Sequence, residues 1–426
     1  MALAVTLIGF LGATCNGAPV STPRIIVDHP TALIDAPLSV RVAQLRPGAE
    51  VTVQARMTDG SGNLWSGSAT FIPGPGGSID LSTARPEPGS SYPNADAMGL
   101  LWSLRPRQSP RLGPSVDEPS SEQVTLTASS GGATSAPMML TRLTTAAGVT
   151  KQQLTVSGQG FYGRLYSPPT VDADTRPAVL LFGGSGGGLS TALEAGLLAS
   201  HGYPTLALAY FAAPGLPPNL VRIPLEYFAG ALTWLERQAG VDTRRVTVIG
   251  ASRGTEAALL LGTRFPDLVH AVAAYSPSSV VNPGLTLRGA VGDPAWTLNG
   301  QAVPTVKLSE YRDPSPAGDP KAIIPVERIR GPVLLVSGSD DRLWPSPRYA
   351  AAIVARLEAA NYPFPHHSLL YEGAGHGVAG AVPYLPVAPP LLQTQYGQLD
   401  LGGSRPANAR ALADSWPKLL QFLASA

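Results

Sequence analysis

The sequence predicts an α/β protein in which a small all-β domain precedes a larger domain with a mainly parallel sheet. Three observations support this prediction. Residues 24–145 contain short strand-like segments between Gly/Pro turns, without an amphipathic helix. Residues 146–426 alternate buried strand-like runs with helix-like runs, which is typical of a parallel sheet covered by helices on both faces. In that second region, one strand-like run ends in a serine flanked by glycines, and a helix-like run follows at once.

Composition limits the class of protein. The chain has 426 residues, enough for two or three domains, and its 44% of hydrophobic residues can supply a core for each. Its 30 basic and 29 acidic residues give a formal net charge of +1, which argues against nucleic-acid binding. Cys15 is the only cysteine, so an internal disulfide and a thiolate metal cluster are excluded. No dinucleotide fingerprint or metal-ligand spacing stands out, and we expect no cofactor and no metal.

Residues 1–23 are a possible signal segment followed by a linker. The run from Met1 to Cys15 is almost wholly apolar, too short to span a bilayer, and resembles the central region of a secretory signal, although no lysine or arginine precedes it. It favours export (periplasmic, lipoprotein or secreted) over a cytoplasmic location; the alternative is an apolar tail on a cytoplasmic protein. Membrane association is expected only with a lipoprotein signal, for which residues 12–15 are a poor match because Thr14 is larger than usual before the cysteine.

The predicted all-β domain covers residues 24–145. Residues 51–58 alternate apolar and polar side chains, as in a half-buried strand, and residues 64–71 can return as the hairpin partner after a turn at 59–63. Further short strand candidates are Leu38–Val42, Ser78–Leu81 and Val124–Leu126. This spacing predicts a small β-sandwich. It contains no titratable cluster, and we expect it to pack against the second domain and to shape the substrate site.

The predicted α/β domain covers residues 146–426. An opening β-ribbon is expected at Leu154–Val156 and Phe161–Tyr166, and Asn299-Gly300 is a plausible hairpin turn. The other expected strands are Ala178–Phe182, Thr205–Tyr210, Val246–Gly250, Val269–Tyr275, Val333–Ser337 and Ser368–Tyr371; helices are expected at Thr191–Ser200, from Pro224 and after Ser252. Residues 278–325 interrupt the alternation. We expect this insertion to lie over the carboxyl ends of the strands and to form part of the acyl or leaving-group pocket.

The glycine-flanked serine has a specific chemical use. Gly250, Ser252 and Gly254 form Gly-x-Ser-x-Gly between a strand and a helix, which is the nucleophile elbow of the α/β-hydrolase fold. The glycines are needed because Cβ atoms would collide with neighbouring backbone in so tight a turn. The turn lifts the Ser252 hydroxyl above the strand end. A chance match in a Gly-rich chain is the alternative.

A serine hydroxyl needs an imidazole to take its proton and a carboxylate to orient that imidazole. In this fold the acid lies in a loop after a later strand, here Val333–Ser337. The acid usually stands three residues after the loop glycine, Gly338, and four before the proline, Pro345, which selects Asp341, with Asp340 as its competitor. A turn-capping aspartate is the alternative for both. Among six histidines, only His376 lies in a loop directly after a strand, between two glycines. The expected catalytic residues are therefore Ser252, Asp341 and His376.

The oxyanion that forms during acyl transfer needs two backbone donors. One is expected from the amide of Arg253, at the start of the helix. The other should come from the loop after the Ala178–Phe182 strand, with Gly184 as first choice and Ser185 next. This glycine-rich loop also superficially resembles a phosphate-binding loop, but no Lys-Ser/Thr follows it, so we do not expect a P-loop.

Beyond these signals, the chain resembles the acyl-CoA thioesterases related to bile acid-CoA:amino acid N-acyltransferase, over nearly its whole length after residue 24. The stretches that carry the resemblance are Ala97–Trp102, Leu206–Tyr210, Pro224–Phe228, Ser252–Glu256, Ile324–Arg328 and Asp340–Trp344. The resemblance implies an immunoglobulin-like N-terminal domain, an α/β-hydrolase C-terminal domain and the triad of Ser252, Asp341 and His376. The amide-forming members carry cysteine where this chain has Ser252, and an acyl-cysteine is more readily aminolysed, so Ser252 favours hydrolysis.

The sequence therefore predicts a serine hydrolase whose partners are an acyl thioester, with acyl-CoA expected, and water. The alternatives are an exported carboxylesterase with the same residues, an acyl-CoA:amino acid N-acyltransferase, and a binding or structural protein with an inactive hydrolase domain. Export would place the protein where acyl-CoA is scarce. Because CoA carries several phosphate charges, cations are expected near the site, and Arg253, Arg342 and Arg222 are the candidates.

Overall fold

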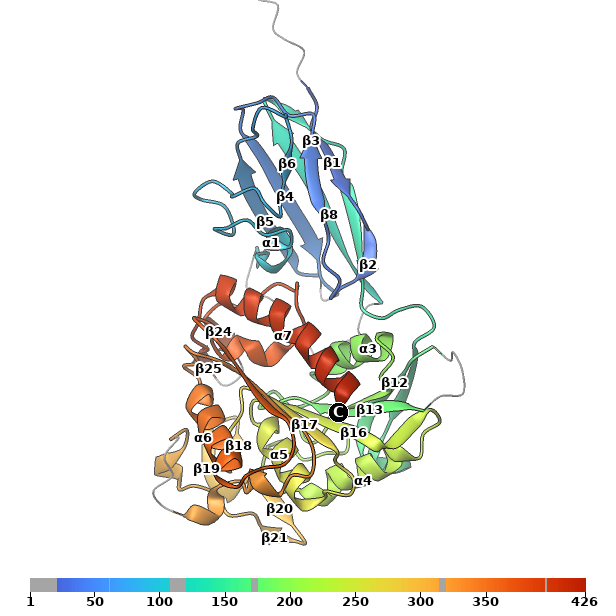
Figure 1. Cartoon of the computed structure of the whole chain (residues 1–426), viewed down its shortest axis with the longest axis vertical. Helices are drawn as coiled ribbons and strands as arrows, with labels where there is room; N and C mark the ends of the chain where they lie inside the picture. Colours follow the sequence, from blue (N-terminus) through green and yellow to red (C-terminus); the bar gives the residue numbers. More distant parts are fainter. Residues whose placement is uncertain (1–20, 61, 108–119, 170–174, 314–318, 395–396) are drawn as a thin grey trace, which may run out of the picture.

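The computed structural model describes residues 21–60, 62–107, 120–169, 175–313, 319–394 and 397–426. Figure 1 shows a β-sandwich stacked on a larger α/β unit, with the last helix of the chain lying between them. The proposed signal segment lies outside the described residues. Among the described helices, none is both long and apolar enough to cross a membrane.

The sandwich consists of two sheets that share one core. One sheet has the order β1-β3-β6, and the other has the order β2-β10-β8-β4-β5-β7, with β9 paired to β8. Their bounds are β1 Arg24–Val27, β2 Thr31–Leu33, β3 Val40–Ala43, β4 Val51–Thr58, β5 Leu64–Phe71, β6 Ile79–Asp80, β7 Arg105–Pro106, β8 Ser121–Ser130, β9 Ala133–Thr134 and β10 Met138–Leu143, with the short helix α1 at Gly99–Trp102. Val51, Val53 and Ala55 of β4 are fully buried and their polar neighbours face outward, as their alternation predicts. The narrower expectation of an immunoglobulin-like domain stays a prediction.

The α/β unit contains an eight-stranded sheet of order β11-β12-β14-β13-β16-β17-β22-β23. Its strands are β11 Thr150–Leu154, β12 Tyr162–Ser167, β13 Arg176–Phe182, β14 Thr205–Ala209, β16 Val241–Ala251, β17 Ala271–Tyr275, β22 Val333–Gly338 and β23 His366–Tyr371. From β14 to β23 every neighbouring pair is parallel, whereas β11 and β12 are antiparallel to their neighbours. The predicted α/β fold with a mainly parallel sheet is confirmed.

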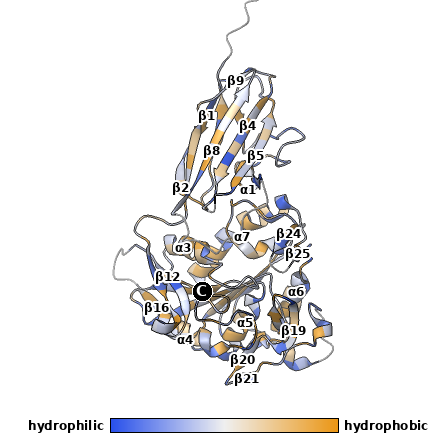
Figure 2. Ribbon diagram, turned by 180° about the vertical axis from the view of Figure 1, so that it is seen from behind, coloured by the Kyte–Doolittle hydropathy of each residue, from blue (hydrophilic) through white to orange (hydrophobic). Residues whose placement is uncertain are grey.

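Helices cover both faces of this sheet. The helices are α2 Val156–Gln159, α3 Ala192–Ser200, α4 Leu225–Glu236, α5 Gly254–Arg264, α6 Ser346–Ala359 and α7 Arg405–Ser425. One apolar core lies under α4, α5 and α6, and a second lies under α3 and α7. The central strands β13, β14, β17 and β22 are buried along almost their whole length, so the sheet is hydrophobic on both faces there. Figure 2 shows orange segments among paler and blue ones in this unit.

The insertion between β17 and β22 contains short strands: β18 Pro283–Thr286, β19 Gly289–Pro294, β20 Trp296–Leu298 and β21 Gln301–Ala302. Asn299 and Gly300 join β20 to β21 with φ of 51° and 74°, so the predicted hairpin turn is confirmed. β20 also pairs with β15 (Ile223–Pro224), which directly precedes α4. The insertion is thus fastened to the α4 side of the sheet.

Several sequence-based boundaries were wrong, two of them in the edge strands of the large sheet. The opening ribbon was expected to include Val156, but β11 ends at Leu154 and Val156 begins α2. This single helical turn is closed by Gly160 at φ +83°, a conformation that glycine adopts readily and that returns the chain into β12. His366 and His367 were expected before the last strand of the sheet but lie within β23, where they pair with Val333 and Leu334.

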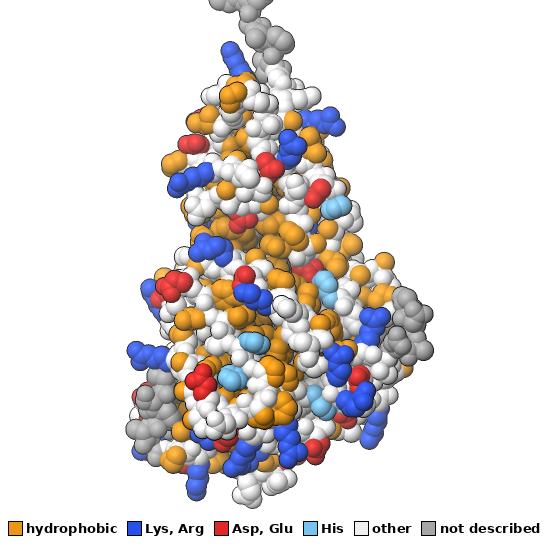
Figure 3. Space-filling view, in the orientation of Figure 1, with side chains coloured by type: hydrophobic (Ala, Val, Ile, Leu, Met, Phe, Trp, Pro, Cys, Tyr) orange, Lys and Arg blue, Asp and Glu red, His pale blue; other side chains and the backbone are white. Residues whose placement is uncertain are grey.

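The two units share a packed junction. Ala409 and Leu412 of α7 belong to the apolar core of the sandwich, and Ile34 of the sandwich belongs to the core under α3 and α7. Asp35 accepts a hydrogen bond from Trp416 Nε1 at 2.7 Å and lies 2.5 Å from His201 Nε2. Figure 3 shows apolar side chains around this junction on the visible face. Both apolar and polar contacts therefore hold the sandwich against the α/β unit.

Candidate active site

Ser252 lies on a sharp turn between β16 and α5. Its φ is +53°, a left-handed conformation that is rare and costly for a residue other than glycine. Its amide donates to the Tyr275 carbonyl at 2.8 Å, which ties the turn to the end of the neighbouring strand β17. A Cβ on Gly254 would lie 2.4 Å from the Gly183 carbonyl oxygen, so glycine is required there. The hydroxyl is thereby held above the carboxyl end of the sheet.

His376 lies against this hydroxyl. Its Nε2 is 2.9 Å from Ser252 Oγ, and its Nδ1 is 2.9 Å from Asp341 Oδ2. The loop that carries it is fixed from a later part of the chain, because the His376 amide donates to the Leu401 carbonyl at 2.8 Å and the Gly375 amide donates to Asn408 Oδ1 at 2.7 Å. A neutral imidazole that donates through Nδ1 to the carboxylate presents Nε2 as an acceptor to the serine.

Asp341 and Asp340 point in different directions. The Asp341 carboxylate is fully buried and accepts from the amides of Leu343 at 3.1 Å and Trp344 at 3.3 Å. The Asp340 side chain is 40% exposed and forms an ion pair with Arg342. The Arg342 hydrogen bond and the Gly403 amide lower the pKa of Asp340. Of the two acids, only Asp341 contacts the imidazole.

Two residues that sequence reasoning missed complete the surroundings of Asp341 and His376. Ser346 is buried at the start of α6, and its hydroxyl donates to Asp341 Oδ2 at 2.5 Å. The Trp344 ring meets the His376 ring edge-on, with centroids 5.8 Å apart. A Ser-Pro helix start directly after the acid loop was the available signal for Ser346. For Trp344, the signal was an aromatic residue three positions after the acid.

The glycine-rich loop after β13 approaches the serine closely. A Cβ on Gly184 would lie 2.7 Å from Ser252 Cβ and 3.2 Å from the Arg253 amide nitrogen. Tyr210 contacts this loop through its hydroxyl, which lies 2.8 Å from the Gly183 carbonyl oxygen and 3.1 Å from that of Gly184. The structure therefore places both expected oxyanion residues, Gly184 and Arg253, beside Ser252.

The side chain of Arg253 does not reach the mouth of the site. It is 1% exposed and lies in an ion pair with Glu256, with 2.8 Å between Nε and Oε1. The expectation that it contacts a CoA phosphate is therefore wrong, because a fully buried guanidinium with a carboxylate partner cannot meet a solvated phosphate. Arg342 is 60% exposed but paired with Asp340 and Asp400, and Arg222 is exposed.

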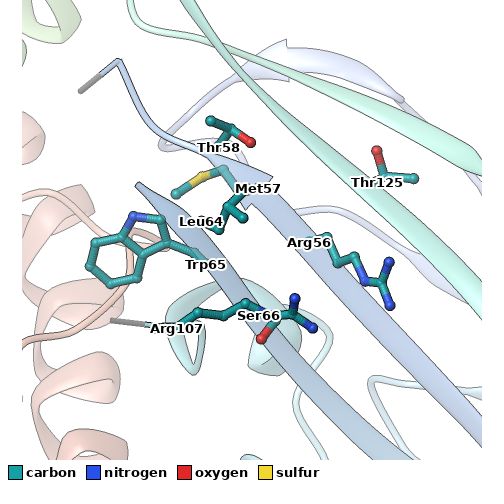
Figure 4. A pocket seen from close by; sticks show the side chains of 8 residues that line it. All are labelled: Arg56, Met57, Thr58, Leu64, Trp65, Ser66, Arg107 and Thr125. Carbon is teal, nitrogen blue, oxygen red and sulfur yellow. The ribbon is translucent and has the colours of Figure 1, made fainter. Parts of the chain in front are cut away.

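A sizeable hollow of about 260 Å³ lies elsewhere, on the sandwich. Figure 4 shows it along β4 and β5, with Trp65 on one side and the guanidinium groups of Arg56 and Arg107 on the other. None of its lining residues belongs to the α/β unit, so it is separate from Ser252. Within the described part of the chain, no three His, Cys, Asp or Glu side chains are grouped as metal ligands would be.

The fold defines the class of protein first: it is an α/β-hydrolase with an N-terminal β-sandwich. Comparison with known families defines it further. Residues 223–426 match the family described as BAAT / Acyl-CoA thioester hydrolase C terminal, and residues 35–156 match Acyl-CoA thioester hydrolase/BAAT N-terminal region. The chain belongs to this family, and the sequence-based recognition of it is confirmed.

Individual relatives agree with this assignment. Acyl-coenzyme A thioesterase 1 of Mus musculus is 30% identical, with 91% of this chain and 93% of the relative aligned. Peroxisomal succinyl-coenzyme A thioesterase of Mus musculus is 28% identical over 91% of this chain and 93% of the relative. Acyl-coenzyme A amino acid N-acyltransferase 1 of Mus musculus is 28% identical over 94% of this chain and 96% of the relative. Proteins named thioesterases and one named an N-acyltransferase thus align along nearly the whole of this chain.

Proposed function

We propose that this protein is a serine hydrolase that cleaves an acyl thioester, acyl-CoA in the first instance, to free acid and thiol. The observation that carries the proposal is the continuous contact from Ser252 Oγ through His376 to Asp341, at 2.9 Å in both steps. It occurs in a chain whose relatives include proteins named acyl-coenzyme A thioesterases.

In the proposed reaction Ser252 Oγ attacks the thioester carbonyl while His376 Nε2 takes the hydroxyl proton. Asp341 holds the ring in the tautomer that leaves Nε2 free to accept, and stabilises the imidazolium that forms. His376 then gives the proton to the departing thiolate. A water molecule, activated by the same imidazole, attacks the acyl-serine and releases the acid, which restores Ser252.

The oxyanion of the tetrahedral intermediate would be held by the amides of Arg253 and Gly184. Arg253 immediately precedes α5, where backbone N–H groups point toward the strand ends and the helix dipole favours negative charge. Gly184 contributes from the facing loop, and only its lack of a side chain permits the close approach, because a Cβ there would lie 2.7 Å from Ser252 Cβ. Ser185 is the alternative second donor.

Serine at position 252 supports hydrolysis over amide formation. An oxygen ester reacts less readily with an amine than a thioester does, so water competes better at an acyl-serine than at an acyl-cysteine. The N-acyltransferase among the relatives keeps acyl transfer to amines as a second candidate. An exported carboxylesterase with the same residues is a third, supported by the apolar N-terminal run.

One experiment separates these candidates. It compares kcat/KM for palmitoyl-CoA and for a neutral ester of the same acyl group, at several ionic strengths, with and without glycine or taurine. We expect palmitoyl-CoA to be the better substrate, its rate to fall with salt because phosphate contacts are screened, and the product to be free acid. Equal salt dependence with a faster neutral ester would point to the carboxylesterase. Amide formed at the expense of acid would point to the acyltransferase.

Two single substitutions, each removing one positive charge, test which arginine contacts the CoA phosphates. We propose Arg342 and Arg222 as the remaining cations, since both are exposed. Arg342→Gln or Arg222→Gln at the true contact should raise KM for palmitoyl-CoA, flatten its salt dependence and leave the neutral ester unaffected. Two variants that both behave like the unsubstituted protein toward palmitoyl-CoA would remove both arginines from the site.

A further inference from the structure

One buried carboxylate lies beside the site without belonging to the triad. Glu256 is on the first turn of α5, fully buried, and four residues after Ser252. Its Oε2 accepts from Trp296 Nε1 at 2.9 Å, and its Oε1 accepts from Asn282 Nδ2 at 3.0 Å. The Asn282 amide adds a contact at 3.3 Å. Burial raises the pKa of Glu256, and the Arg253 guanidinium, Trp296 and Asn282 oppose that rise.

The cation that pairs with Glu256 belongs to the residue after the nucleophile. Arg253 Nε lies 2.8 Å from Glu256 Oε1, and Nη2 donates to Glu256 Oε2 at 3.3 Å. Nη2 also donates to the carbonyls of Asn282 at 3.1 Å and Pro283 at 2.9 Å. The residue whose amide is the proposed oxyanion donor is therefore anchored through its own side chain.

These contacts reach the insertion at two points. Asn282 and Pro283 stand where the insertion leaves the sheet region and enters β18, and Trp296 begins β20, which pairs with β15 before α4. Asn282 and Trp296 are both fully buried. The ion pair thus joins the nucleophile turn, the first turn of α5 and the base of the insertion in one polar cluster.

We propose that Glu256 is a positioning residue: by holding the Arg253 side chain against Asn282 and Pro283, it fixes the Arg253 amide beside Ser252 and fastens the insertion to the nucleophile turn. This rests on the proposed function, in which that amide holds the oxyanion. A donor at the wrong distance stabilises the transition state less while leaving the bound ground state largely unaffected. A buried carboxylate without its cation would be strongly unfavourable, so the two charges are interdependent.

The test measures kcat and KM of Glu256→Gln per active site, counted by fluorophosphonate titration of Ser252. We expect kcat to fall ~10–100-fold with KM changed less than about twofold. A trifluoromethyl ketone forms a hemiketal oxyanion on the serine and should lose affinity by the same factor as kcat/KM. A purely structural role would lower the fraction of titratable sites and the thermal midpoint, but neither kcat per site nor the affinity for the ketone.

Glu256→Gln alone leaves Arg253 without its carboxylate and can fail to fold. The double variant Arg253→Met/Glu256→Met removes both buried charges together and should fold. It should keep the loss in kcat, because without the guanidinium no side chain ties residue 253 to the carbonyls of Asn282 and Pro283. Full kcat per site in the double variant would overturn the proposal. Glu327→Gln, which breaks the Arg356 ion pair away from Ser252, is the control and should leave kcat unchanged.

The outcome is separable from that of the proposed function. If the unsubstituted protein hydrolyses p-nitrophenyl esters but not thioesters, the thioesterase proposal fails, while the same kcat, KM and ketone comparison is made on the ester. If Glu256→Gln then behaves like the Glu327→Gln control in all three measurements, the positioning proposal fails on its own.

Discussion

Oδ2 of Asp341 lies 2.9 Å from Nδ1 of His376, while the neighbouring Asp340 turns away and pairs with Arg342. This difference between adjacent acids has a direct kinetic consequence. Asp341→Asn should hold the imidazole in the wrong tautomer and lower kcat by about 10⁴. Asp340→Asn should change kcat by less than about tenfold, because the exposed ion pair with Arg342 and the hydrogen bond from the Gly403 amide that it weakens do not involve His376. Steady-state kinetics on both variants checks this, and a severe Asp340→Asn with a mild Asp341→Asn would reverse the assignment.

A second prediction concerns the loop after β13. Gly184→Ala should lower kcat about 10²-fold, because the added Cβ would lie 2.7 Å from Ser252 Cβ and push the proposed oxyanion donor out of place. Gly186→Ala is the matched control in the same loop, since a Cβ there meets no atom within 4 Å. Turnover per titrated active site is the measurement. Equal rates for the two alanine variants would argue against a close approach of Gly184 in catalysis.

Local sequence signals predicted the parts of the molecule that depend on neighbouring residues. The strand before Ser252 and the helix after it follow from residue periodicity, and the hairpin at Asn299-Gly300 follows from turn chemistry. The position of His376 could be expected from chain order, because only one histidine follows a strand in a loop. These predictions do not depend on which distant segments pack against the elements concerned.

Other features of the site depend on contacts between segments that are far apart in the sequence, and local signals did not predict them. Asp340 and Asp341 share the same local signals, and the choice between them involves the loop at residues 402–403: the Gly403 amide donates to Asp340 Oδ2 at 3.0 Å, and Gly402 forms a β-bridge with Asp341. The burial of Arg253 depends on Asn282 and Pro283 in the insertion. Its spacing of three to Glu256 within one helical turn was the available signal, but an exposed pair has the same spacing.

The junction between the two units gives a stability prediction. Arg405, at the start of α7, donates to the carbonyls of Val387 at 2.8 Å, Leu104 at 2.7 Å, and Trp102 and Ser103, both at 3.1 Å. Burial, with a smaller effect of Arg105, lowers the pKa of Arg405 to about 10. Arg405→Met should leave four carbonyls without this donor and destabilise the protein by about 2–3 kcal/mol.

The matched control for Arg405→Met lies on the same helix. Arg410 is exposed, and Arg410→Met should change stability by no more than about 0.5 kcal/mol. Thermal unfolding of the full chain, followed by circular dichroism and by tryptophan fluorescence, compares the two variants. If both variants have the same thermal midpoint as the unsubstituted protein, Arg405 contributes no net stability to the junction.

A pH dependence of stability follows from Glu122 of β8, which lines a small cavity between the sandwich and residues 384–386. Burial, with a smaller effect of Asp59, raises the pKa of Glu122 to about 6 from its ordinary 4.5. Between these values the folded protein binds the proton more tightly than the unfolded chain, so this contribution to stability is full below pH 4.5 and is lost as pH rises to 6.

Glu122→Gln should therefore stabilise the protein at pH 7.5, by at most about 1 kcal/mol after solvent screening, and the gain over the unsubstituted protein should vanish toward pH 4. Urea unfolding of both proteins across this range measures the difference, with the exposed Glu50→Gln as control. A difference that stays constant from pH 4 to 7.5 would mean that Glu122 titrates alike in the folded and unfolded states.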